Sequence, residues 1–162
     1  MKNRIDQSRL EKILEVYFPN CRYLLEAELD FPKGNGRFRI LSSCYMKNTG
    51  HFNAAEAIMC YNQLAYALLA EAGEQSLLEG LGKIPFEQFL EWQLGNCFIV
   101  GMDNIKFKKQ INPSEEFYGE IALNKAKKLG RLYIFKTSYD FEGGKATGDI
   151  ELALVVGDKK WQ

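Results

Sequence analysis

Four side chains suited to chemistry on a carbonyl group lie close together in the sequence. Tyr45, His51 and Asn53 follow one another across a polar, glycine-containing stretch, and Asn62 comes nine residues after Asn53. A phenol, an imidazole and two amides can donate or accept hydrogen bonds, and the imidazole and the phenol can also move protons. We therefore interpret these four residues as the candidate catalytic set.

Asn53 is also expected to cap a long helix that runs from Ala54 to about Ala72. The first N–H groups of a helix have no partner within it, and the helix dipole adds partial positive charge there. Ala54 and Ala55 have small side chains, so a substrate can approach the backbone closely. We predict that a carbonyl oxygen that becomes an oxyanion is bound at this helix start.

Asn62 lies about two and a half turns into the same predicted helix. It shares an apolar stripe with Ile58, Ala65 and Leu69. An amide in such a stripe needs a hydrogen-bond partner, and a bound substrate or a water molecule would supply one. We therefore expect Asn62 to face the substrate, with Ile58 beside it.

Each of these residues also has a purely structural interpretation. His51 can hydrogen-bond the backbone before a helix, Tyr45 can be a core residue at a strand end, and Asn53 can be an N-cap alone. Glu56 stands in the first turn of the predicted helix. It is expected to be a surface charge favoured by the helix dipole rather than a base.

The elements that must position these residues follow from the hydrophobic pattern and the turn residues. A first helix is predicted from Asp6 or Ser8 to about Tyr17. A hairpin follows, with strands at Tyr23 to Asp30 and Arg37 to Met46 around a turn cluster at Phe31 to Gly36. This hairpin is expected to deliver Tyr45 on its second strand.

The second half of the chain has the pattern of strands. After an irregular and partly helical excursion over residues 75–96, apolar residues alternate with a period of two. Four strands are predicted, and we expect them to form an antiparallel meander: Cys97 to Lys109, Glu115 to Lys127, Arg131 to Phe141 and Ala146 to Val156.

The long helix decides the expected fold. It is apolar nearly all round, so it should be buried on more than one side. One such helix beside about six strands predicts a single α+β domain over residues 1–162. We expect a curved antiparallel sheet wrapped around the helix, which is the hot-dog fold. An α+β sandwich with the helix on one face of the sheet is the alternative.

Composition argues against several classes of protein. Lys and Arg total 21 and so do Asp and Glu, which disfavours a dedicated nucleic-acid binder. His51 is the only histidine and no CxxC pair occurs, so no metal site is expected. Four buried free thiols are predicted, at Cys21, Cys44, Cys60 and Cys97. The charged N-terminus and the absence of an apolar run of about 20 residues predict a soluble, cytoplasmic protein with no membrane span.

The segment around the candidate set resembles a known family. Tyr45, then Thr49-Gly50-His51-Phe52-Asn53, then Cys60-Tyr61-Asn62-Gln63-Leu64-Ala65-Tyr66 is similar to the FcoT family of hot-dog long-chain fatty acyl thioesterases. Members or close relatives of that family are enoyl carrier-protein glycyltransferases of isonitrile lipopeptide biosynthesis. The resemblance implies that Tyr45, Asn53 and Asn62 occupy the active-site positions, and that the helix carries no acidic base. An aromatic from the N-terminal region, Tyr17 or Tyr23, would complete the site.

A second resemblance is weaker. Gly50-His51-Phe52 is similar to the Gly-His-Phe of hot-dog 3-hydroxyacyl carrier-protein dehydratases, in which a histidine and a helix carboxylate move protons at C2 and C3. The following proline and the helix carboxylate are missing here, so dehydration is not expected. Addition of a nucleophile at C3 of an enoyl thioester needs a similar layout.

These observations predict an enzyme that acts on a fatty acyl thioester of coenzyme A or of an acyl carrier protein. The expected outcome is hydrolysis, or addition of glycine to C3 of a (2E)-enoyl thioester, with no cofactor and in a homodimer or larger assembly. The alternatives are a non-catalytic acyl-thioester-binding module and a hydratase or dehydratase. A basic cluster at Lys125, Lys127, Lys128 and Arg131 is a docking site for an acidic carrier protein or, as we expect, a solvated strand end.

Overall fold

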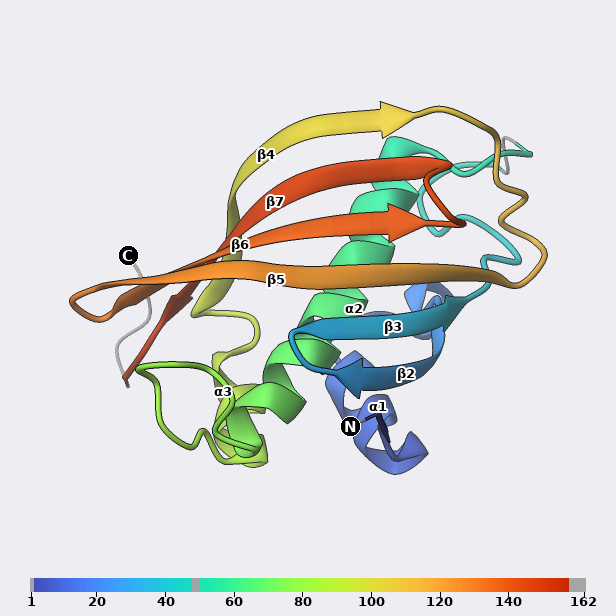
Figure 1. The fold of residues 1–162 in the computed structure, drawn as a ribbon. Coiled ribbons are helices and arrows are strands. Elements are labelled where there is room, and N and C mark those ends of the chain that lie inside the picture. The colour runs from blue at the N-terminus through green and yellow to red at the C-terminus, as the bar shows by residue number, and fades with distance from the viewer. Residues whose placement is uncertain (1, 48–49, 158–162) are drawn as a thin grey trace.

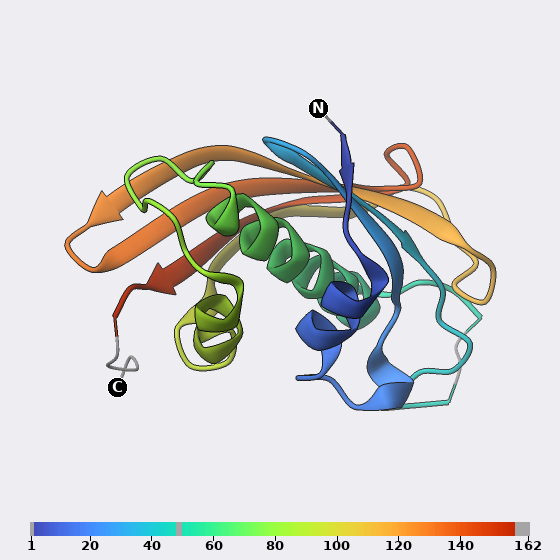
Figure 2. The ribbon, with the colours of Figure 1, turned by 90° about the horizontal axis from the view of Figure 1, so that it is seen from below.

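The computed structural model describes residues 2–47 and 50–157 of the chain. Within these residues, a seven-stranded sheet curves around one long helix, as Figures 1 and 2 show from two directions. This arrangement confirms the predicted α+β class, with a curved antiparallel sheet wrapped around a central helix. No helix in this part of the chain is long and apolar enough to cross a membrane.

In the described part of the chain, three helices and one 3-10 turn accompany the sheet. They are α1 (Gln7–Leu14), η1 (Pro19–Cys21), α2 (Ala54–Glu74) and α3 (Phe86–Trp92). The strands are β1 (Asn3–Arg4), β2 (Leu24–Asp30), β3 (Lys33–Phe38), β4 (Cys97–Phe107), β5 (Phe117–Leu129), β6 (Leu132–Phe141) and β7 (Ala146–Val155). Their order across the sheet is β1-β2-β3-β5-β6-β7-β4, and every neighbouring pair is antiparallel.

The central helix α2 begins directly after Asn53, as predicted, and continues two residues beyond the predicted end. Most of its side chains are buried, including Leu64 and Leu68. The sheet covers one side of α2, whereas α1 and α3 lie against other sides (Figure 2). An ion pair of 2.7 Å between Arg9 and Glu71 joins α1 to α2. The helix is therefore buried on more than one side, which is what its apolar surface predicts.

The hairpin β2–β3 is tighter than predicted. Its turn is confined to Phe31 and Pro32, and β3 contains Gly34 and Gly36, which the sequence analysis placed in the turn. A Cβ atom at Gly34 would lie 3.3 Å from the Cβ atom of Leu68 on α2. These glycines therefore allow close packing of the strand and do not form the turn.

A consequence of the earlier turn is that β3 ends at Phe38 rather than at Met46. The segment between β3 and α2 is a long loop, so the prediction that a strand delivers Tyr45 is wrong. Residues 48–49 of the predicted polar loop lie outside the described residues. The first helix is also shorter than predicted, because α1 ends at Leu14 and not at Tyr17.

The predicted four-strand meander is also wrong in one strand. β5, β6 and β7 are consecutive neighbours, but β4 pairs with β7 at the edge of the sheet, and β5 has β3 as its other neighbour. Alternation in a sequence identifies a strand but does not identify its partner, which explains the error. The two-residue strand β1 raises the total from the expected six strands to seven.

A cluster of phenylalanines fixes the start of α2 against the sheet. The ring of Phe52, one residue before the N-cap, lies 5.0 Å from the ring of Phe117 and 5.2 Å from that of Phe141. The Phe52 N–H also donates to the carbonyl oxygen of Ile111 at 3.0 Å. Since Phe52 is held by core packing and by a backbone hydrogen bond, the position of Asn53 relative to the sheet is well defined.

Candidate active site

Tyr45 and Asn53 meet at the start of α2. The Tyr45 hydroxyl donates a hydrogen bond of 2.8 Å to Asn53 Oδ1. The Tyr45 side chain is 44% exposed, so its hydroxyl lies at the surface and not in the core. The structure therefore brings together two of the four residues in the candidate set, and it does so through a loop instead of a strand.

Asn53 and Glu56 form a capping box. Asn53 Oδ1 accepts the Glu56 N–H at 3.1 Å, and a Glu56 carboxylate oxygen accepts the Asn53 N–H at 3.2 Å. Each side chain thus satisfies a backbone donor of the other residue at the helix start. The Asn-x-x-Glu spacing is the sequence signature of this motif, and it could have identified the contact in advance.

Glu56 is not the surface charge that was expected. Its side chain is 1% exposed, and its second carboxylate oxygen accepts a hydrogen bond of 2.6 Å from the Ser43 hydroxyl. The loop that carries Tyr45 covers this carboxylate, which explains the burial. Ser43 and Glu56 therefore hold the loop against the first turn of α2, a role that the sequence analysis missed.

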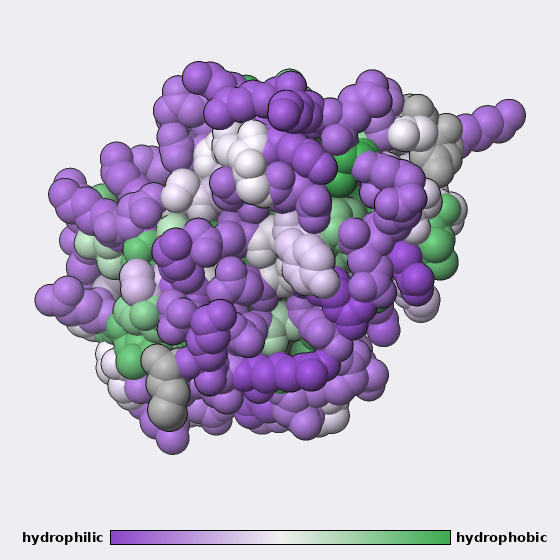
Figure 3. All heavy atoms as spheres, turned by 45° about the vertical axis from the view of Figure 1, so that its right-hand side comes forward, coloured by the Kyte–Doolittle hydropathy of each residue, from purple (hydrophilic) through white to green (hydrophobic). Residues whose placement is uncertain are grey.

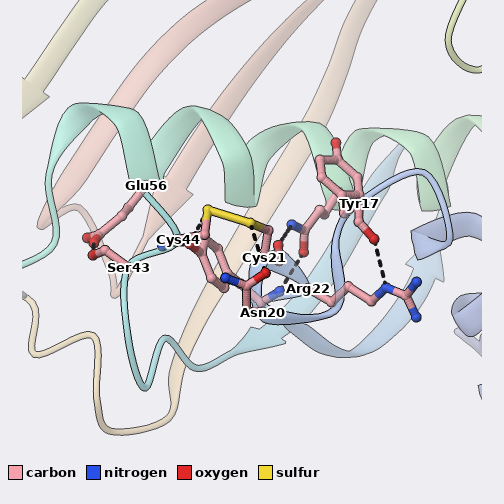
Figure 4. The surroundings of a disulfide bond; sticks show 9 residues. Tyr17, Asn20, Cys21, Arg22, Ser43, Cys44 and Glu56 are labelled. Atoms are coloured by element: carbon pink, nitrogen blue, oxygen red, sulfur yellow. Dashed lines mark hydrogen bonds between the residues drawn. A yellow bond between two sulfur atoms is a disulfide. The ribbon is translucent and has the colours of Figure 1, made fainter. Parts of the chain in front are cut away.

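A disulfide joins Cys21 in η1 to Cys44 in the same loop, with 5.7 Å between the two Cα atoms. The prediction of four free thiols is therefore wrong for this pair, and it is confirmed for Cys60 and Cys97, which are buried and free. Cys21 and Cys44 lie 23 residues apart and only the fold brings them together. Figure 4 shows the disulfide alongside the first turns of α2, with the Ser43–Glu56 contact nearer the helix start.

Gln63 holds Cys21, the η1 cysteine of this disulfide, against α2. Its side chain is fully buried; its Oε1 accepts the backbone N–H groups of Tyr23 and Leu24, both at 2.9 Å, and its Nε2 donates to the Cys21 carbonyl at 2.6 Å. An amide with three such hydrogen bonds fixes η1 and the start of β2 on α2. Since Cys21 is held in this way, the disulfide positions Cys44 and the loop residues on either side of it.

Several donors at the helix start are available to a ligand. Within residues 2–47 and 50–157, the N–H groups of Ala54 and Ala55 have no hydrogen-bond partner, and both residues are exposed. The Asn53 oxygen is engaged by Tyr45 and Glu56, but its Nδ2 group donates to no described residue. Backbone and amide donors that converge at the positive end of a helix are suited to binding a carbonyl oxygen that gains negative charge.

Asn62 lies farther along α2 and does not touch this group. At about 1.5 Å per residue it is roughly 12 Å from Ala54 along the helix axis. Its side chain is half-buried, and among the described residues it makes no hydrogen bond. His51 is exposed in the loop before the helix. Among the described residues, no hydrogen bond joins Asn62 to the Tyr45–Asn53 pair.

The two N-terminal tyrosines occupy different places. Tyr23 is buried, and its hydroxyl lies 3.4 Å from both the backbone nitrogen and the sulfur of Cys44, next to Tyr45. Tyr17 is half-buried, with its ring 6.5 Å from that of Tyr66. Burial raises the pKa of both Tyr17 and Tyr66, so each phenol keeps its proton. Ile58 is half-buried on α2 between the helix start and Asn62.

No group of three or more potential metal-ligating side chains occurs among the described residues. The basic cluster at Lys125, Lys127, Lys128 and Arg131 surrounds the turn between β5 and β6. This turn lies at the opposite end of the molecule from the start of α2 in both ribbon views (Figures 1 and 2).

Comparison with solved structures supports the fold. A dehydratase heterocomplex from Xenorhabdus doucetiae matches with a TM-score of 0.60 at 11% identity and covers 93% of each chain. A mutant thioesterase from Pseudomonas aeruginosa matches with a TM-score of 0.55 at 12% identity and covers 93% of this chain and 94% of that one. At such low identity these likenesses concern the fold alone.

Comparison of sequences is more specific. A relative from Mycobacterium marinum named (2E)-enoyl-[ACP] glycyltransferase is 33% identical, with 93% of this chain and 87% of the relative covered. A protein of the same name from Streptomyces coeruleorubidus is 29% identical, with 93% and 97% covered. The FcoT-like thioesterase domain matches residues 12–154, which is most of the chain. This chain therefore belongs to the FcoT-like thioesterase family.

Proposed function

We propose that this protein adds glycine to C3 of a (2E)-enoyl thioester carried by an acyl carrier protein. The observation that carries the proposal is the set of unpaired donors at the start of α2, from Asn53, Ala54 and Ala55, beside the Tyr45 hydroxyl. The glycyltransferase name of the relatives supports the choice of glycine as nucleophile and of a carrier protein as the acyl donor.

The reaction can be written on these groups. The amine of glycine forms a bond to C3, the C2–C3 π electrons move toward the carbonyl, and the thioester oxygen gains negative charge. The N–H groups of Ala54 and Ala55 and the Asn53 amide stabilise that charge. The amine then loses a proton and C2 gains one, a transfer that we assign to His51, with Tyr45 as a further hydrogen-bonding group.

Hydrolysis of the thioester is the second candidate, favoured by the description of the family. Water attacks the carbonyl carbon and forms a tetrahedral intermediate, in which the former carbonyl oxygen carries the negative charge. The intermediate then collapses, and the thiol leaves with a proton. The same helix-start donors stabilise this oxyanion, because both reactions place negative charge on the same oxygen. Hydrolysis can also follow glycine addition and release the product from its carrier. Coenzyme A thioesters would enter the same site.

Assembly with a second copy is part of the proposal. β4 lies at the edge of the sheet, so one row of its backbone groups has no strand beside it among the described residues. Val100, Met102 and Phe107 on this strand are about half exposed. The exposed apolar side chains around Val100 and Met102 on this edge strand suit antiparallel pairing with its own copy. Light scattering should give the mass of a dimer or larger assembly, and a Met102→Glu chain should be shifted toward the monomer.

Mass spectrometry of a (2E)-enoyl carrier protein, incubated with the enzyme in the presence and absence of glycine, tests the proposed reaction. We expect the carrier-bound acyl group to gain the mass of one glycine only when glycine is present. Free enoic acid in both samples would favour hydrolysis alone. A gain of one water at C3 would favour a hydratase, and unchanged thioester with saturable binding would indicate a non-catalytic module.

A further inference from the structure

Three lysines, Lys106, Lys108 and Lys109, lie at and just beyond the end of β4; we refer to them as the β4-end lysines. All three side chains are exposed, and none forms an ion pair with a carboxylate in residues 2–47 or 50–157. Lys145 on the neighbouring turn differs, because it lies 3.6 Å from the carboxylate of Glu142. The β4-end lysines are thus a local excess of positive charge on a chain with no net charge.

The β4-end lysines are attached to the start of α2. The Phe107 ring, between the first two of them, lies 6.5 Å from the ring of Phe52. The Phe52 N–H donates to the carbonyl oxygen of Ile111, two residues beyond Lys109. Both contacts are made by the residue that precedes Asn53, so the lysines stand at the same end of the molecule as the unpaired donors of the candidate site.

The basic cluster at Lys125, Lys127, Lys128 and Arg131 lies elsewhere in the molecule and makes different contacts. Lys128 lies 5.4 Å from the ring of Tyr133, and Arg131 donates to the Val156 carbonyl at 2.9 Å. The Tyr133 hydroxyl in turn donates to the carbonyl of Gly80, in the segment that follows α2. This cluster is therefore at the far end of α2 from the unpaired donors, and it has structural contacts there.

A thioester on a carrier protein reaches its enzyme on a phosphopantetheine arm, whose phosphodiester is negatively charged and joins the arm to the protein surface. The side of the molecule where β4 ends is mainly hydrophilic, with apolar side chains only in separate patches (Figure 3). A polar surface with unpaired cations beside the site suits an encounter guided by charge more than one driven by apolar burial.

We propose that the β4-end lysines form the docking surface for the acidic face of an acyl carrier protein around its phosphopantetheine attachment point. This inference rests on the proposed function, because it takes the substrate to be bound to a carrier. The docked carrier places its arm so that the thioester enters beside Ala54 and Ala55. Docking is electrostatic, so it weakens as the salt concentration rises.

The test compares two charge-reversal variants of equal size. In the first, Lys106, Lys108 and Lys109 are changed to Glu; in the control, Lys125, Lys127 and Lys128 are changed to Glu. Turnover is measured with a (2E)-decenoyl acyl carrier protein and with the N-acetylcysteamine thioester of the same acid, which has neither phosphate nor protein. A third chain with Lys→Gln at the β4-end lysines separates loss of charge from reversal of charge.

We expect the first variant to raise KM for the carrier-bound substrate by about tenfold or more, with a smaller rise for the Gln variant. Turnover of the small thioester should stay at the wild-type value, and light scattering should give the wild-type mass, which together show that the fold and the assembly are intact. The control variant should change neither. An unchanged KM for the carrier-bound substrate, or an equal rise in the control, overturns the proposal that the β4-end lysines are the docking surface. Turnover of the small thioester still measures the reaction in that case.

Direct binding separates this inference from the proposed function. Calorimetry with the same carrier protein and an unreactive acyl amide gives Kd without turnover. Weaker binding by the first variant alone supports the docking surface even if no glycine product forms. Equal binding by all chains, or no binding by the wild type, contradicts it.

Discussion

The Tyr45 hydroxyl and the Glu56 N–H donate to one and the same atom, Asn53 Oδ1, at 2.8 and 3.1 Å. The oxygen of Asn53 therefore has a structural task, whereas its Nδ2 group is left for a ligand. A single side chain thus begins the central helix, positions a phenol and presents a donor. This arrangement allows the structural and chemical roles of Asn53 to be tested separately.

Changing Asn53→Asp should separate the two roles. An aspartate keeps the capping oxygen and suits the positive end of the helix, so the free energy of unfolding should change by less than about 1 kcal/mol. It removes the Nδ2 donors and adds a negative charge beside the developing oxyanion, so turnover should fall by about a hundredfold. Asn53→Ala should lose both turnover and about 1 kcal/mol of stability. Full activity in the Asp chain would show that Nδ2 has no part in the reaction.

Changing Tyr45→Phe should reduce turnover with little effect on folding. The ring is 44% exposed, so removal of its hydroxyl should lower the free energy of unfolding by no more than about 1 kcal/mol. We expect turnover to fall by about tenfold or more, because the hydroxyl stands beside the helix-start donors. Tyr118→Phe is the matched control, since that ring is 62% exposed on β5. Equal turnover in the two variants would assign Tyr45 a purely structural role.

Reduction of the Cys21–Cys44 disulfide should destabilise the protein. The bond closes a loop across a sequence separation of 23 residues. By restricting the unfolded chain, a loop of this length raises the free energy of unfolding by about 3 kcal/mol. Urea unfolding with and without dithiothreitol measures the difference, and a Cys44→Ser chain should match the reduced wild type. Cys60→Ser is the control, because its loss should leave the effect of the reductant intact. A wild type that unfolds identically in both conditions would contradict the expectation.

The buried free thiols should make stability depend on alkaline pH. Burial raises the pKa of Cys97 from its ordinary value of 9.0 to about 12, and it raises the pKa of Cys60 well above that ordinary value. The folded chain keeps these protons above pH 9 whereas the unfolded chain releases them. The contribution of the two protonated thiols to the free energy of unfolding is therefore complete below pH 9, and it is lost as the pH rises toward 12.

The measurement is the free energy of unfolding at pH 9 and at pH 10. Each buried thiol should lower it by about 1 kcal/mol over this interval. A Cys97→Ala chain should show a slope smaller by that amount, even though its stability is lower throughout. If wild type and variant have the same slope, Cys97 ionises in the folded state as readily as in the unfolded one.

Much of the fold followed from the sequence because α2 has an unusual pattern. Its apolar residues, its N-cap at Asn53 and its small residues at Ala54 and Ala55 all lie in one continuous segment, and local physics determines where such a helix begins. The strands of the second half were recognised by alternation, with ends misplaced by a few residues. The partner of β4 is decided by contacts far apart in the sequence, which a local pattern does not contain.

The errors in the site have one common cause. Gly34 and Gly36 were interpreted as turn residues, although they allow β3 to pass close to α2 and to the core. This misinterpretation placed the end of the strand at Met46 instead of Phe38, so the long loop that follows β3 was not predicted. The loop brings Ser43 over Glu56 and Cys44 to Cys21, so a carboxylate expected in solvent is buried and two thiols expected to be free are joined. The Asn53–Glu56 spacing was the one local signal for this arrangement.

Both proposed reactions require a thioester carbonyl to be bound at the start of α2. A crystal structure of the protein with an unreactive (2E)-enoyl amide of pantetheine measures this directly. We predict that the carbonyl oxygen lies within hydrogen-bonding distance, about 3 Å, of the Ala54 or Ala55 nitrogen or of Asn53 Nδ2. A carbonyl bound away from the helix start, with these three donors still in solvent, would contradict the account.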